Sequence, residues 1–255
     1  MTGLIKKGPR VLLAGLFILA LINGVAQTTA GETHPLLEKI QKAYRRADHL
    51  SFSVNYVYAN SGQPDRPTDS LRGEIQLDGD RCRFVIDNTE TIVTEKHAIR
   101  IMNEEKAIYL LGKGQNMTAL PDLLGMTDSL LAHMQGLTIS VQQQGVFQLL
   151  VMKFPPGQMY SRISLIVDPA TGYLQQASYA IHTEGLVGKD MVESQGHAAP
   201  YQPEGVINVF FSEYEHDRFR DDLFDENQIF ARVAGHYQPV GQYKTFHIFL
   251  ASNNL

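Results

Sequence analysis

Apolar and polar side chains alternate over long parts of this chain, most clearly between residues 51 and 87. Every second position is apolar from 52 to 58, and the same period returns at 71–77 and at 82–86. A period of two sends successive side chains to opposite faces of a strand, so the pattern predicts strands with one buried and one solvated face. The intervening Asp78-Gly79-Asp80 supplies a tight turn, which makes residues 71–87 a predicted hairpin.

The remaining sequence predicts more strands and few helices. An amphipathic helix is expected over Pro35–Asp48, and one or two short helices within 120–134, where apolar residues follow a helical period. The fold class expected is α+β, with a large antiparallel sheet in a single domain over 27–255 and a loop insertion near 184–205. Further strands are predicted at 92–94, 97–102, 107–111, 137–142, 145–153, 161–167, 173–182 and 206–214, with weaker candidates at 224–233 and 243–250.

The N-terminus has the pattern of a secretory signal peptide. Three basic residues between positions 6 and 10 precede an almost unbroken apolar run at 11–22, and small residues favour cleavage after Ala26 or, as a second candidate, after Ala30. The alternative is a retained transmembrane anchor, but a run of about 15 residues is shorter than the ~20 that span a bilayer. We therefore expect a signal peptide at 1–26, and a mature chain that has no transmembrane span and, without a nearby cysteine, no N-terminal lipid anchor.

Charge and cysteine content exclude several classes of function. Without the predicted signal peptide the chain has 19 Lys and Arg against 27 Asp and Glu, a balance that argues against nonspecific nucleic-acid binding. The one cysteine, Cys82, allows neither an internal disulfide nor a Cys-only zinc site. Alternation directs it away from Arg81 and Arg83, so it is interpreted as a small buried hydrophobe; a reactive thiol is the alternative.

Motifs for catalysis or metal binding are lacking. The nine histidines include no HExxH, HxxxH or HxH spacing and are interpreted as scattered surface residues. The acidic run 213–226 lacks the ligand order of an EF-hand and is interpreted as a solvated loop. There is no GxSxG, SxxK or complete P-loop. A Ser-His-Asp triad assembled in space stays open, but the sequence favours a protein that is not an enzyme and needs no metal or cofactor.

The most informative feature is apolar. A sheet with aromatic residues on its strands and few helices to cover it can enclose an apolar cavity, and the Met- and Leu-rich segment 117–134 suits a movable cover. The alternative is an ordinary core in which a helix docks on a sheet. The side chains expected to bind lipid are Phe52, Val54, Phe84, Ile86, Leu123, Leu124, Leu130 and Leu131.

The order of these segments resembles the LolA/LolB family of periplasmic lipoprotein carriers and receptors. Residues 36–58 are similar to its opening helix and first strand, and 71–86 to its second and third strands, although Asp78-Gly79-Asp80 replaces an Arg-Pro step of the family. For that reason no strand arginine is carried over. Residues 163–179 and 205–214 resemble later strands. The resemblance implies a half-open, curved antiparallel barrel (half-barrel), lid helices and an apolar interior.

These observations predict a periplasmic, non-catalytic carrier whose partners are lipid or lipoprotein acyl chains. A second hypothesis is a structural or adaptor component of a cell-envelope or secretion assembly, in which the 184–205 loop and the acidic 213–226 segment contact an envelope protein partner. A hydrolase of envelope lipids is a more distant third hypothesis, which requires Ser, His and Asp to meet in one pocket.

Overall fold

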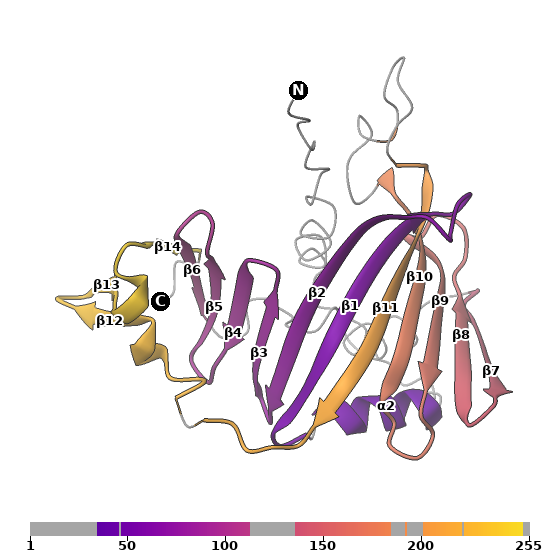
Figure 1. The fold of residues 1–255 in the computed structure, drawn as a ribbon, viewed down its shortest axis with the longest axis horizontal. Helices are drawn as coiled ribbons and strands as arrows, with labels where there is room; N and C mark the ends of the chain where they lie inside the picture. The colour runs from indigo at the N-terminus through magenta and orange to yellow at the C-terminus, as the bar shows by residue number, and fades with distance from the viewer. Residues whose placement is uncertain are drawn as a thin grey trace, which may run out of the picture. The chain divides into compact units, whose positions relative to one another are not determined.

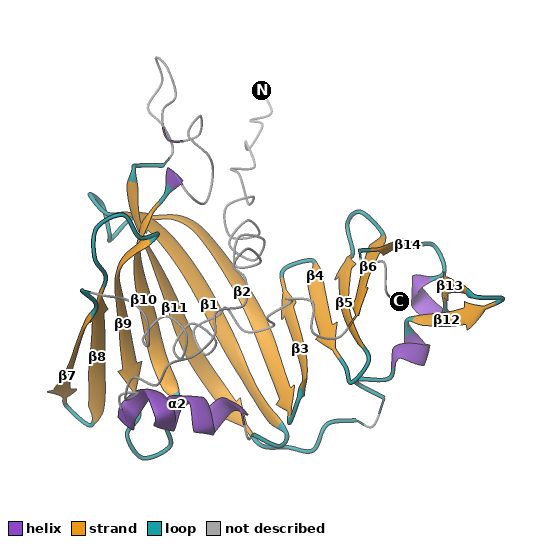
Figure 2. Cartoon of the chain, turned by 180° about the vertical axis from the view of Figure 1, so that it is seen from behind, coloured by secondary structure: helices purple, strands orange, loops and turns teal. Residues whose placement is uncertain are grey.

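The computed structural model describes residues 35–45, 47–112, 136–184, 192, 201–220 and 222–251. The predicted signal peptide, the predicted lid helices within 120–134 and most of the 184–205 loop therefore lie outside the described residues. The elements are drawn along the chain in Figure 1 and by type in Figure 2.

The chain begins its described part with helix α2 (Pro35–Arg45), which confirms the predicted N-terminal helix although it ends three residues earlier. Proline suits a first turn because the missing N–H is not needed there. Leu36, Leu37, Ile40 and Tyr44 recur at helical spacing, and all four are buried. The helix thus packs one apolar stripe and leaves Glu38 and Lys39 exposed.

Twelve strands form one open sheet in the order β14-β6-β5-β4-β3-β2-β1-β11-β10-β9-β8-β7 (Figure 1). The long strands β1, β10 and β11 curve along their length (Figure 2). The expected fold class is confirmed: an N-terminal helix accompanies a large sheet that does not close, as in a half-barrel. The strands are β1 (Leu50–Asn60), β2 (Pro67–Asp78), β3 (Arg81–Ile86), β4 (Thr89–Val93), β5 (His97–Met102), β6 (Ala107–Gly112), β7 (Thr138–Gln144), β8 (Phe147–Lys153), β9 (Tyr160–Val167), β10 (Leu174–His182), β11 (Glu204–Glu215) and β14 (His247–Leu250).

Two predicted turns are confirmed in detail. At the β2–β3 turn Gly79 has a φ of +59°, a left-handed conformation that suits glycine. At the β9–β10 turn Gly172 has a φ of +85° and its N–H donates to the carbonyl of Asp168 over 2.8 Å. Local turn chemistry therefore sets where both hairpins begin, although the register of β9 and β10 shifts between Leu174 and Gln176 and again between Ala180 and Ile181.

The sheet differs from the prediction at one edge, because β14 pairs with β6 in parallel. The predicted large antiparallel sheet is therefore a mixed sheet at this edge. A parallel pair needs a crossover, and the intervening residues here include a small separate hairpin of β12 (Phe230–Val233) and β13 (His236–Pro239). The weak strand predicted at 224–233 is partly a 3₁₀ turn, Glu226–Gln228, followed by β12.

The chain forms two compact units, whose boundaries fall within α2, β1, β2 and β11 and in the segment between β6 and β7. In the unit that holds β7–β10, tyrosine rings pack beside aliphatic side chains in the core. Tyr58 packs edge-on against Tyr201 at 5.5 Å between ring centroids and shares a 3.1 Å hydrogen bond with Thr183. Gly205 lies so close to the Tyr58 ring that an added Cβ would fall 2.4 Å from it.

The other unit holds β3–β6, β14 and the segment from 212 onward. One face of β4–β6 packs against this C-terminal segment in a buried cluster that joins Ile99, Ile101 and Ile108 to Phe224 and Phe230. The face that carries this cluster is called the tail face below. The opposite face of the same strands carries the candidate site.

Candidate functional site

The candidate site begins where α2 lies against β1. Phe52 packs edge-on against Tyr44 of α2, with 5.5 Å between ring centroids, and stacks on Tyr214 at 5.2 Å. The hydroxyls of Tyr44 and Tyr214 share a 2.5 Å hydrogen bond. The sheet face that carries Phe52 is called the helix face below.

The helix face continues from β1 to β3 through close contacts. A Cβ added to Gly73 of β2 would lie 3.3 Å from a methyl carbon of Val54 and 2.6 Å from Cγ1 of Ile86. Ile86 is the register partner of Gly73. Because a strand alternates faces, Phe84 and Ile86 share one face of β3, and Phe52 and Val54 share one face of β1.

The structure therefore brings four of the eight predicted lipid-binding residues onto one face. Phe52, Val54, Phe84 and Ile86 are all buried, with exposed fractions of 6% or less. Leu123, Leu124, Leu130 and Leu131 lie outside the described residues. Whether the four bind lipid stays a prediction.

A row of side chains crosses the helix face from β2 to β14. Directly opposite residues of neighbouring strands share a face, so the register alone defines this row. It runs from apolar to polar and back to aromatic: Ile75, Phe84, Thr91, Arg100, Tyr109 and Phe249. The last two rings stack at 5.2 Å between centroids. We call this set the cross-strand row.

Two polar residues in the middle of the cross-strand row have no partner among the described residues. Thr91 is fully buried, and its hydroxyl makes no hydrogen bond. Arg100 is half-buried, and desolvation by this burial lowers the pKa of its guanidinium. In the part of the chain that the structure describes, Arg100 forms neither an ion pair nor a hydrogen bond.

Another arginine of the same sheet shows the usual arrangement. Arg83, on the tail face, donates to Glu90 over 2.6 Å and to Gln76 over 2.9 Å. Arg100 lacks such acceptors although it lies only two strands away. The sequence did hold a signal for it, since alternation in the predicted strand 97–102 separates Arg100 from Ile99 and Ile101.

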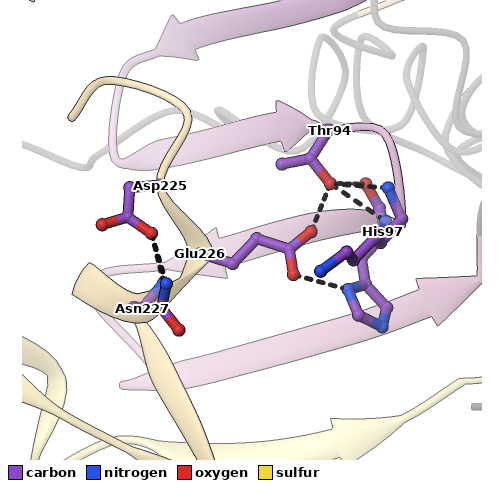
Figure 3. Close-up of polar contacts among 6 residues, drawn as sticks. Thr94, His97, Asp225, Glu226 and Asn227 are labelled. Carbon is purple, nitrogen blue, oxygen red and sulfur yellow. Dashed lines mark hydrogen bonds and ion pairs between the residues drawn. The ribbon is translucent and has the colours of Figure 1, made fainter. Parts of the chain in front are cut away.

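A second polar cluster lies on the tail face (Figure 3). Glu226 accepts a hydrogen bond from the Thr94 hydroxyl, and its other oxygen lies 2.8 Å from Nδ1 of His97. The backbone N–H groups of Lys96 and His97 donate to the same hydroxyl. His97 also packs edge-on against Phe230.

This cluster joins the C-terminal segment to the β4–β5 turn. The Thr94 hydroxyl donates to the carboxylate rather than to the imidazole, so His97 does not act as its base, as it would in an activated nucleophile. His97 is 15% exposed, which differs from the expectation that the histidines are scattered over the surface. Among the residues described, no group of three or more His, Cys, Asp or Glu is arranged to hold a metal ion.

The acidic run 213–226 is less solvated than expected. Glu226 is 15% exposed and is held by Thr94 and His97, and a carboxylate oxygen of Glu213 accepts from the Ser53 hydroxyl over 2.5 Å. Several other acids, such as Glu215 and Asp217, are exposed. The interpretation as a solvated loop is therefore wrong at Glu226, which anchors the run to the sheet.

Comparison with known proteins gives matches in fold only. No family model and no curated protein matches the chain. LolA-like proteins are among the solved structures that the chain resembles. A LolA superfamily protein from Nitrosomonas europaea matches with 11% identity and a TM-score of 0.36, over 78% of this chain and 99% of that one. Lipoprotein LppX of Mycobacterium tuberculosis matches with 12% identity and a TM-score of 0.37, over 72% and 97%.

A third match is the MucA/MucB complex of Pseudomonas aeruginosa, with 14% identity and a TM-score of 0.39, over 80% of this chain and 62% of that one. At identities of 11–14% no residue role is carried over from these proteins. Within the described ranges, no helix combines the length and apolar character needed to cross a membrane.

Proposed function

We propose that this protein is a periplasmic, non-catalytic carrier that binds acyl chains of a lipid or lipoprotein on its helix face. The observation that supports the proposal is the apolar face shared by Phe52 and Val54 of β1 and Phe84 and Ile86 of β3, which Gly73 of the intervening β2 brings into close contact. The signal-peptide pattern at 1–26 supports export to a compartment where acyl cargo needs a carrier.

The energetics of such binding are adequate without a covalent or metal contact. Burying one methylene contributes about 0.8 kcal/mol, so about a dozen methylenes contribute roughly 10 kcal/mol before the costs of association. An acyl chain has enough methylenes to supply this free energy, whereas a small polar metabolite does not. The proposed ligand class follows from the apolar character of the four side chains.

Tryptophan fluorescence offers a direct test, because the chain has no tryptophan of its own. Phe84→Trp places one reporter on the helix face. We expect acyl chains that carry bromine atoms to quench its fluorescence, since quenching requires contact. The matched control is Phe230→Trp, whose reporter lies in the buried cluster of the tail face and is expected to stay unquenched.

Circular dichroism checks that both variants fold like the wild type. Native mass spectrometry and lipid extraction of wild-type protein purified from the periplasm add a measurement that needs no substitution, and bound acyl lipid is the expected result. Equal quenching of both reporters, or no quenching together with lipid-free purified protein, would contradict the proposal.

A further inference from the structure

We propose that Arg100 and Thr91 bind the carboxylate of a long-chain fatty acid whose hydrocarbon chain lies over Phe84 and Ile75. This inference rests on the proposed function and adds to it the chemical class of the head group. It follows from the cross-strand row, from the absence of partners for its two polar members, and from their chemistry.

The row places a cationic residue in its middle, beside apolar residues on the same face. Thr91 is the register partner of both Phe84 and Arg100, and Phe84 in turn pairs with Ile75. Neighbouring strands lie about 4.8 Å apart, so roughly 14 Å separate Arg100 on β5 from Ile75 on β2. A long acyl chain can follow this distance in a direction perpendicular to the strands.

The two polar residues of the row, Arg100 and Thr91, need a hydrogen-bond acceptor. A guanidinium has only donors, and a buried hydroxyl normally has a hydrogen-bond partner. Within the described ranges neither Arg100 nor the Thr91 hydroxyl has one, and the row contains no acidic side chain. Leaving a charge partly desolvated and unpaired costs free energy, which an anionic ligand would recover.

The geometry favours a carboxylate. Guanidinium and carboxylate form paired hydrogen bonds in one plane, and one negative charge balances the single positive charge of the row. The full burial of Thr91 favours a small head group over a bulky one. On the other side of Arg100, the stacked rings of Tyr109 and Phe249 supply an apolar border.

Displacement of a bound neutral apolar fluorophore, 1-anilinonaphthalene or a close analogue, measures the preference for the head group. Dodecanoate is expected to displace the probe from the wild type at about tenfold lower concentration than methyl dodecanoate, because the ester lacks the charge. Arg100→Gln should reduce this ratio to about one without changing displacement by the ester. The matched control is Arg72→Gln, which removes an exposed charge from β2 and should keep the wild-type ratio.

Two further variants separate ligand binding from a structural role. Thr91→Val keeps the shape of the side chain and should lower the ratio several-fold. Arg100→Met should give ligand-free protein with an unfolding temperature equal to or above that of the wild type, because it removes an unpaired charge. A marked fall in that temperature would instead assign Arg100 a structural role and overturn the inference.

The outcomes separate the two proposals. If neither dodecanoate nor its ester displaces the probe, the proposed function itself fails. If both displace it equally from the wild type, an acyl carrier is supported but the assignment of Arg100 and Thr91 is overturned. Dodecyl phosphate that displaces the probe as well as dodecanoate, or better, would overturn the assignment of a carboxylate.

Discussion

The thiol of Cys82 lies on the helix face of β3, opposite the side that carries Arg83. Burial raises the pKa of this thiol to about 12, although a hydrogen bond with the backbone of Val93 acts in the other direction. The prediction that Cys82 and its flanking arginines lie on opposite faces of the strand is thus confirmed for Arg83. With so little thiolate at neutral pH, the side chain behaves as a small hydrophobe.

This shift predicts that stability falls in mild alkali. The thiol of the unfolded chain has a pKa of about 8.5, so the folded state holds this proton more tightly. The stability that the protonated thiol contributes is complete below about pH 8.5, and it is lost as the pH rises toward the pKa of the thiol in the folded state. Between pH 7.5 and 9.5 we expect the free energy of unfolding, measured with urea, to fall by about 1 kcal/mol in the wild type.

Cys82→Ala is the control for this measurement. The alanine variant should lose clearly less stability over the same pH range, even if it is less stable at pH 7.5. Parallel losses in the two proteins would show that other groups cause the change.

At the residue scale, the sequence predicted apolar positions better than polar ones. Period two placed Phe52, Val54, Phe84 and Ile86 correctly, because a strand with one buried face leaves no other register. Arg100 and Thr91 meet only through the pairing of β4 with β5, and a strand pattern alone does not state which residues become register partners. That is why the polar pair that Arg100 and Thr91 form on the helix face was not predicted from the sequence.

Among the described residues, Glu226 joins the segment that follows β11 to the sheet through polar contacts. Glu226 starts a 3₁₀ turn whose preceding Asp225 accepts from the N–H of Asn227, and it contacts Thr94 and His97 of the β4–β5 turn (Figure 3). Apolar contacts of Phe224 and Phe230 support the same docking. Polar and apolar contacts together therefore hold this segment to the β4–β5 turn and the tail face.

We expect Glu226→Gln to loosen this segment. Replacing a carboxylate that accepts two hydrogen bonds with a neutral amide should lower the free energy of unfolding by about 1–3 kcal/mol. Limited proteolysis should then cut more rapidly within 216–246. Glu215→Gln, which removes an exposed charge from the end of β11, should behave like the wild type. Equal proteolysis of all three proteins would contradict the anchoring role.

At the element scale, hairpins were predicted more fully than the C-terminal segment, where the strand candidates 224–233 and 243–250 contain β12 and β14 but β13 and the pairing of these strands were missed. β2–β3 and β9–β10 combine alternation with turn residues that mark where each hairpin begins. β12, β13 and β14 have only four residues each, too few for a period to be evident. The parallel pairing of β14 with β6 depends on the docking of the whole segment, which no local pattern records.

The whole molecule is proposed to act outside the cytoplasm, and this depends on residues 1–26. We expect the exported protein to begin at Gln27, because small residues precede that bond, with Gly31 as the second candidate. Intact-mass measurement of protein from the periplasmic fraction checks this. Replacing the apolar run 11–22 with polar residues should leave uncleaved protein in the cytoplasm, whereas a retained N-terminus in wild-type protein would contradict cleavage.

The strand at one end of the sheet, β14, comes from residues 247–250, whereas its partner β6 ends at residue 112. During translocation from the N-terminus, the edge of β6 and the isoleucines of the tail face would emerge well before the residues that cover them. Folding of this unit thus requires residues 247–250 as well as β6. In the proposed export route, the edge of β6 and the tail-face isoleucines stay uncovered until those residues arrive, a delay that a meander completed strand by strand would not have.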